Sequence, residues 1–122
     1  MAEQLPPQVQ NQVMRFQELQ EQLRLIILRK QQFELELREV EAAYEEANNL
    51  SPDTTIYKAV GVLLFKTEKD KVLKELSDRK EELDLRIKTL EKQEARLKQQ
   101  LEELRKSIAT YMSQGSSVAG GS

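Results

Sequence analysis

Two heptad repeats, one on each side of a short apolar stretch near residue 60, constrain the fold of this chain more than any other feature. Apolar or aromatic side chains recur in each half at alternating steps of three and four residues. The first repeat comprises Val9, Gln12, Phe16, Leu19, Leu23, Ile26, Lys30, Phe33, Leu37, Val40, Tyr44 and Ala47. The second comprises Leu73, Leu76, Lys80, Leu83, Ile87, Leu90, Glu94, Leu97, Leu101, Leu104, Ile108 and Tyr111. A heptad pattern sustained over this length predicts a coiled coil.

The two repeats match each other when the chain folds back around its middle. Every a position of one repeat then meets a d position of the other without a skip, so that Phe33 faces Ile87 and Leu23 faces Leu97. The matching lengths predict a mainly α fold, a long antiparallel two-helix coiled-coil hairpin. We expect Lys80, which lacks a core partner, to extend its ammonium group into water.

Local signals place the ends of the elements. Pro6 and Pro7 favour a helix start, and Asn48 followed by Pro52 favours a stop. Thr67 with Asp70 forms a variant of the capping box at the second start. We therefore predict one domain over residues 1–122. Its parts are helices at 8–48 and 68–112, a β-hairpin at 54–66, and a disordered Gly- and Ser-rich tail at 113–122.

Charged side chains four residues apart should support the exposed face of the second helix. The expected pairs are Glu75 with Arg79, Glu82 with Arg86, and Glu102 with Lys106.

The middle of the chain carries strand-forming residues on both sides of a turn at Val60-Gly61. A lone two-stranded hairpin is only marginally stable, and its apolar faces and open edges favour association. One alternative is a buried, irregular connection between the helices. We prefer a β-hairpin that oligomerises with others into a β-barrel. The residues assigned to this oligomerisation are Ile56, Tyr57, Val60, Gly61, Val62, Leu63, Leu64 and Phe65.

Composition argues against several classes of function. Charged residues make up 33% of the chain and hydrophobic ones 39%, with a net charge of −2, so there is no electrostatic case for nucleic-acid or membrane binding. Histidine and cysteine are absent, and no Gly-rich phosphate loop is present. No apolar run approaches the roughly 20 residues that span a bilayer. We expect a cytoplasmic protein that is not an enzyme and uses no metal or cofactor.

Apolar side chains also continue to the free ends of both helices, where a coiled coil frays. This set consists of Val9, Val13, Met14, Phe16, Ile108, Tyr111 and Met112. A second apolar group, Leu25, Ile27 and Leu28, lies outside the seam. It is either a set of scattered surface residues or an additional adhesive lining.

Three segments together resemble the β subunits of the prefoldin family. They are Ile56-Tyr57-Lys58-Ala59-Val60-Gly61, Leu63-Leu64-Phe65-Lys66-Thr67 and the later run from Arg86 to Glu94. The middle has room for one hairpin, as in β-type subunits, whereas α-type subunits carry two.

The resemblance implies an ATP-independent chaperone of archaeal type. Its hairpins would form β-barrels, and its helix tips, here the apolar residues at the free ends, would hold unfolded protein clients and pass them to a group II chaperonin. The implied assembly is a hexamer of two α-type and four β-type subunits. A homo-oligomeric filament, as in γ-type prefoldin, is the close alternative. A different function also fits the pattern, that of an architectural spacer with one defined partner.

Overall fold

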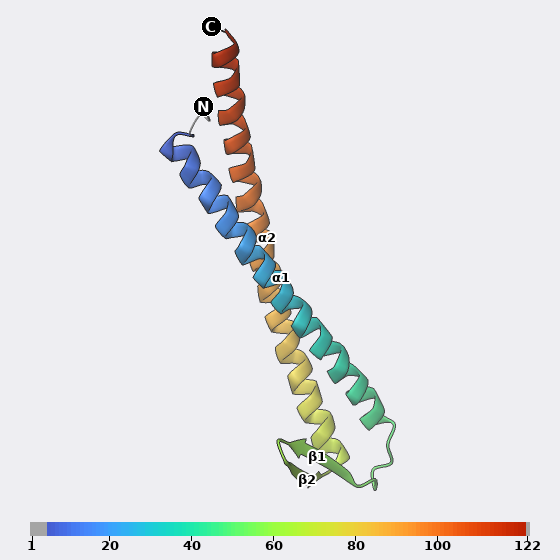
Figure 1. Ribbon diagram of the computed structural model, residues 1–122. Coiled ribbons are helices and arrows are strands. Elements are labelled where there is room, and N and C mark those ends of the chain that lie inside the picture. The colour runs from blue at the N-terminus through green and yellow to red at the C-terminus, as the bar shows by residue number, and fades with distance from the viewer. Residues whose placement is uncertain (1–4, 122) are drawn as a thin grey trace. The chain divides into compact units, whose positions relative to one another are not determined.

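The computed structural model describes residues 5–121, and the side chains of residues 5–114. Along the chain it contains α1 (Pro7–Asn48), β1 (Ile56–Val60), β2 (Leu63–Thr67) and α2 (Lys69–Gly121) (Figure 1). Two long helices joined by a short antiparallel β-hairpin confirm the predicted fold class.

The described residues divide into two compact units. The terminal unit contains the chain up to Arg29 together with the chain from Leu90 onward, and the hairpin unit contains Lys30–Thr89. Each helix contributes a segment to both units. The single domain over residues 1–122 stays a prediction.

In the terminal unit the buried residues follow the predicted heptads. Val9, Leu19 and Leu90 are buried, and the other apolar seam positions of the unit are half-buried except Tyr111, which is exposed. The Gln12 side-chain amide donates a hydrogen bond to the Ser107 hydroxyl, with Nε2 and Oγ 3.0 Å apart. The two helix segments of this unit are therefore joined by a polar contact as well as by apolar packing.

In the hairpin unit the core is centred on Leu83, which has no exposed surface. Ala47 and Ile87 are also buried, and the Arg86 guanidinium lies 5.7 Å from the centre of the Phe33 ring. Lys80 is exposed, as expected for a long side chain that reaches water from a seam position.

The ion pairs on α2 agree only in part with the expected four-residue spacing. Glu82 pairs with Arg86 at 2.8 Å, as predicted. The predicted partner of Glu75 was wrong, because Glu75 pairs with Lys58 of the hairpin at 2.9 Å. Glu102 pairs with Arg105, three residues away, at 2.7 Å. A planar guanidinium offers several donors, so it can form a pair at three-residue spacing as readily as at four.

Gly61 sets the geometry of the hairpin turn. The register pairs Val60 with Leu63, so the turn residues are Gly61 and Val62, one position beyond the predicted turn. Gly61 has φ 58°, and no other described residue has a positive φ. A positive φ at the first turn residue alone defines a type II′ turn, which matches the right-handed twist of the flanking strands.

The start of α2 differs from the prediction. Thr67 belongs to β2 and does not cap the helix. The Glu68 carbonyl accepts a hydrogen bond from the Val72 N–H at 3.0 Å, which makes Glu68 the residue that precedes the helix. The strand ladder to Ile56 uses Thr67, so the capping position moves one residue onward.

The C-terminal end of α2 also differs. We predicted a disordered tail over 113–122, whereas α2 continues to Gly121, and Ser122 lies outside the described residues. The tail contains no proline, and of its three glycines two, Gly120 and Gly121, lie at the very end of α2. Gly115 lies inside the helix, where a glycine costs about 1 kcal/mol relative to alanine. Helix propagation from the long α2 is therefore compatible with this sequence.

Candidate interaction surfaces

The hairpin exposes an apolar surface, which we call the hairpin surface. Its members each have at least half of their surface exposed, and Val62 is fully exposed. They are Tyr57, Val60, Val62, Leu63, Leu64 and Phe65. A contiguous exposed patch of large apolar side chains is typical of an interaction site. The structure therefore brings together six of the eight residues assigned to oligomerisation from the sequence. The other two are the turn residue Gly61 and the half-buried Ile56.

The two faces of the hairpin have different surroundings. The register places Lys58 and Phe65 on one face, and Tyr57 and Leu64 on the other. On the first face the Lys58 ammonium contacts the Glu75 carboxylate of α2, so this face is directed toward α2 at its base. The opposite face carries Tyr57, Ala59, Leu64 and Lys66, and all four are exposed. This second face is free for contact with another chain.

Both strands also have an open edge. Within the described chain the sheet consists of β1 and β2 alone, so each strand has a neighbour on one side only. An open edge presents unpaired backbone N–H and C=O groups, which pair readily with another strand. The open edges and the exposed apolar face both favour assembly through the hairpin.

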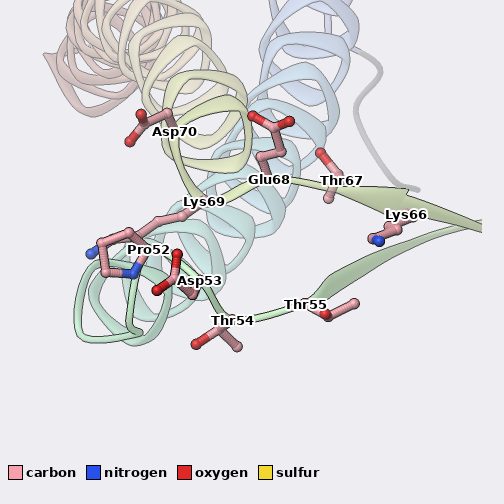
Figure 2. A pocket seen from close by; sticks show the side chains of 9 residues that line it. All are labelled: Pro52, Asp53, Thr54, Thr55, Lys66, Thr67, Glu68, Lys69 and Asp70. Carbon is pink, nitrogen blue, oxygen red and sulfur yellow. The ribbon is translucent and has the colours of Figure 1, made fainter.

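A polar hollow of about 300 Å³ lies at the base of the hairpin (Figure 2). It is lined by the segment before β1 and by the junction of β2 with α2. The lining residues are Pro52, Asp53, Thr54, Thr55, Lys66, Thr67, Glu68, Lys69 and Asp70. The Lys69 ammonium donates a hydrogen bond to the Leu50 carbonyl at 2.8 Å, which connects the chain after α1 to the start of α2.

In the described chain no three His, Cys, Asp or Glu side chains are grouped in a way that could hold a metal ion. The hollow is therefore best understood as the structural junction of the hairpin.

Electrostatic contacts connect the hairpin to α2. The hydrogen bond and charge of Lys58 lower the pKa of Glu75. Further along α2, Arg79 and Arg86 together lower the pKa of Glu82. Both shifts favour the charged form of these carboxylates, each of which contacts a basic side chain.

The residues assigned to client binding all lie in the terminal unit. Val9 is 1% exposed, and Val13, Phe16 and Ile108 are half-buried. Met14, Tyr111 and Met112 remain exposed. With the Gln12–Ser107 hydrogen bond in place the ends are closed. Val9 would therefore reach a client only after the helix ends separate.

A second hollow, of about 310 Å³, lies between the helix segments near their ends, and we call it the tip hollow. Its lining residues are Gln8, Val9, Gln12, Ser107, Thr110, Tyr111 and Gln114. Most of these side chains are polar and none is charged. Apart from Tyr111, none of these polar residues was predicted from the sequence, because the predicted site otherwise consisted of apolar side chains. The signal in the sequence was the absence of charge from residues 4–14 and 107–122 of a chain that is one-third charged.

A third hollow, of about 360 Å³, lies in the terminal unit closer to Arg29. Its lining residues are Gln22, Leu25, Ile26, Gln93, Arg96 and Leu97. Leu25 and the nearby Leu28 are about half exposed. Scattered surface residues and an additional adhesive lining both remain open for Leu25, Ile27 and Leu28.

No described helix is both long enough and apolar enough to cross a lipid bilayer. The helices instead carry many charged side chains, including Glu21 and Arg24 of α1, which pair at 2.6 Å, and the pairs of α2 described above.

Comparisons with known proteins agree with these features. The family model described as prefoldin subunit matches residues 10–115. A prefoldin subunit beta from Saccharolobus islandicus (strain L.S.2.15 / Lassen #1) is 50% identical over 113 residues, which cover 93% of this chain and 90% of the relative. A prefoldin subunit beta from Sulfurisphaera tokodaii is 44% identical over 121 residues, which cover 99% and 97%. The crystal structure of the prefoldin beta subunit from Thermococcus strain KS-1 superimposes with a TM-score of 0.83 at 39% identity, covering 90% of this chain and 96% of that one.

The fold, the exposed hairpin and these relatives place the chain among the subunits of oligomeric chaperones. The chain belongs to the prefoldin family, as a β subunit of the archaeal type. In the known prefoldin arrangement, hairpins from several subunits join into a β-barrel, and the subunits assemble with one another.

Proposed function

We propose that this chain is a holdase subunit. It captures unfolded polypeptides at the helix ends of the terminal unit, without ATP, and passes them to a group II chaperonin in the cytoplasm. The observation that carries the proposal is the separation of two surfaces on one chain. An apolar hairpin surface is available for assembly, and uncharged helix ends with exposed Met14 and Met112 are available for a client.

Assembly multiplies the effect of each weak site. A single pair of helix ends offers few exposed apolar side chains, so one contact with a client is weak. Several such ends on one particle can engage one long unfolded chain, which raises the effective concentration of each further contact. Methionine side chains adapt to varied partners, so this site does not require one client sequence.

The proposed assembly is a hexamer of two α-type and four β-type subunits. Self-assembly through the same hairpin surface, up to a filament, is the second arrangement that the open strand edges support. Native mass measurement on the chain alone, and then after mixing with an α-type prefoldin subunit, separates the two.

The proposal is tested by aggregation of reduced, unfolded lysozyme diluted into buffer without ATP. The full chain in its assembled form should suppress the light scattering. A variant that lacks residues 1–16 and 104–122 keeps the hairpin unit and the seam around Leu90, so it should assemble normally yet lose the protection. If this shortened variant protects lysozyme as well as the full chain does, the client site lies elsewhere, with the Leu25–Leu28 segment as the next position. If the full chain does not protect lysozyme at all, a spacer with a defined partner becomes the better explanation.

A further inference from the structure

The helix ends differ from the rest of the chain in charge. Residues 4–14 and 107–122 contain no charged residue, although charged residues make up 33% of the chain. The structure brings the described parts of these segments together in the terminal unit, where Gln12 donates to Ser107 across the seam at 3.0 Å. Two stretches that are far apart in the sequence therefore meet, and this end is uncharged across residues 5–14 and 107–114.

The tip hollow lies within this uncharged end. Three of its lining residues, Gln8, Gln12 and Gln114, carry side-chain amides, and Ser107, Thr110 and Tyr111 carry hydroxyl groups. A glutamine amide offers both N–H donors and a carbonyl acceptor, and a hydroxyl can serve in either role. The hollow is thus equipped to pair with a ligand that presents neutral donors and acceptors side by side.

The tip hollow offers polar surface beside a comparable amount of apolar surface. Its aliphatic member, Val9, is 1% exposed, because its side chain packs into the seam. An ionic ligand would find no opposite charge among the lining residues. The peptide group remains the best match, because it carries one N–H donor and one C=O acceptor, and an unfolded chain leaves many of them unpaired.

We propose that the tip hollow binds the client through its backbone amide groups, with the exposed Met14 and Met112 of the same unit adding apolar contacts. This inference rests on the proposed holdase function and names the chemistry of its client site. Every polypeptide carries the same backbone, so recognition of this kind is independent of the client sequence. A chain that has folded pairs its own amides in helices and sheets and no longer offers them, which gives a physical basis for release.

The first test uses two soluble probes that differ in one hydrogen-bonding group. A 20-residue peptide of alternating glycine and serine, and the same peptide with every glycine N-methylated, compete against fluorescent unfolded lysozyme for the assembled protein. N-methylation removes the N–H donor from every second amide and leaves the serine hydroxyls in place. The N-methylated chain should require at least about tenfold more material to compete, a ratio that corresponds to about 1.4 kcal/mol. Equal competition by the two probes, or none by either, overturns the inference.

The second test changes the hollow. The double variant Gln8→Ala with Gln114→Ala removes two amides, and alanine preserves the helix. The matched control is Gln17→Ala with Gln20→Ala, because these exposed glutamines lie in the same unit outside the hollow. Each hydrogen bond lost should weaken client binding by about two- to tenfold. The control should bind as the unchanged protein does, and all proteins should show equal helicity by circular dichroism.

The outcomes separate this inference from the proposed function. Unchanged binding by the Gln8/Gln114 variant, or an equal loss in the control, overturns backbone recognition. If the variant lacking residues 1–16 and 104–122 still loses protection in that case, the helix ends remain the client site and bind by apolar contact alone.

Discussion

The Arg79 guanidinium of α2 donates from both Nε and Nη2 to a single carboxylate oxygen of Glu36 in α1, with Nε 2.8 Å from Oε1. The same guanidinium contacts Glu82 on its own helix, with Nη1 and Oε2 3.1 Å apart. The two carboxylates raise the pKa of Arg79, Glu36 contributing most. A lysine could not make this contact, because its single ammonium lacks the planar fork. Arg79 therefore joins the two helices of the hairpin unit at one position of the seam.

Replacing Arg79 with methionine should lower the thermal midpoint, because the change removes an ion pair that connects two helices. The matched control is Arg105→Met, because among the described residues Arg105 pairs only with Glu102, on its own helix. Both pairs are substantially exposed, so the losses should be small. Arg79→Met should still cost more than Arg105→Met, and Arg79→Lys should recover only part of the difference. Equal midpoints for the two methionine variants, measured by circular dichroism at low salt, would contradict a cross-helix role.

Leu83 and Leu85 lie two positions apart on α2, but the exposed fraction of their surface differs greatly. Leu83 has no exposed surface, whereas Leu85 is 62% exposed on the outer face. Leu83→Ala should cost about 2–5 kcal/mol in the free energy of unfolding, because it leaves a cavity in the seam. Leu85→Ala should change stability by at most about 0.5 kcal/mol. Denaturant unfolding at matched protein concentration checks this pair. Similar losses would mean that the outer face of α2 is buried in the assembly.

The contact between the hairpin and α2 should depend on pH through Glu75. The fold lowers the pKa of Glu75 from the ordinary value of 4.5, chiefly through its hydrogen bond with Lys58. A carboxyl group whose pKa is lower in the folded state contributes its full stabilisation above the unfolded pKa. It loses that stabilisation as the pH falls through the folded pKa. The contribution is thus present near neutral pH and disappears below pH 4.5.

Titration by NMR of the carboxyl carbons checks this dependence. In Lys58→Met the pKa of Glu75 should rise toward its ordinary value, because its main partner is gone. The pKa of Glu102 is lowered by Arg105 and should not move, so it provides an internal control. A Glu75 titration that is the same in both proteins would show that the Lys58 contact does not persist in solution.

The heptads and the hairpin could be predicted because they follow from the periodicity of large side chains. Leu19, Leu83 and Leu90 are buried where the repeat places them, and a single glycine indicates the turn. Burial in a two-helix seam depends mainly on position within the repeat, so the sequence is enough to locate it. The prediction was less accurate for long charged side chains. Arg79 and Glu75 each had several partners within reach, and helix spacing alone could not choose among them.

The tip hollow shows a different limit of sequence reasoning. Apolar residues at the helix ends suggested an adhesive groove, yet Val9 turns into the seam and glutamines line the hollow. Hydrophobicity does not report which polar groups from two distant segments will meet. The charge-free runs at both ends were visible in the sequence, but only the structure shows that Gln12 of one run contacts Ser107 of the other.

Leu64 provides the sharpest test of assembly through the hairpin. Its side chain is 70% exposed in the single chain, on the strand face directed away from the Lys58–Glu75 contact. Leu64→Glu should therefore leave the helices and the hairpin of one chain intact, because the new carboxylate is in water. In a sheet formed from several hairpins the same position would be buried, and an unpaired carboxylate there is strongly unfavourable. Native mass spectrometry should show smaller assemblies, and circular dichroism should show unchanged helicity.

Leu85→Glu is the matched control, because Leu85 is similarly exposed at 62% but lies on the outer face of α2. It should keep the native mass of the unchanged protein. If Leu64→Glu also keeps that mass, the hairpin surface does not carry the assembly, and the subunits associate through another face.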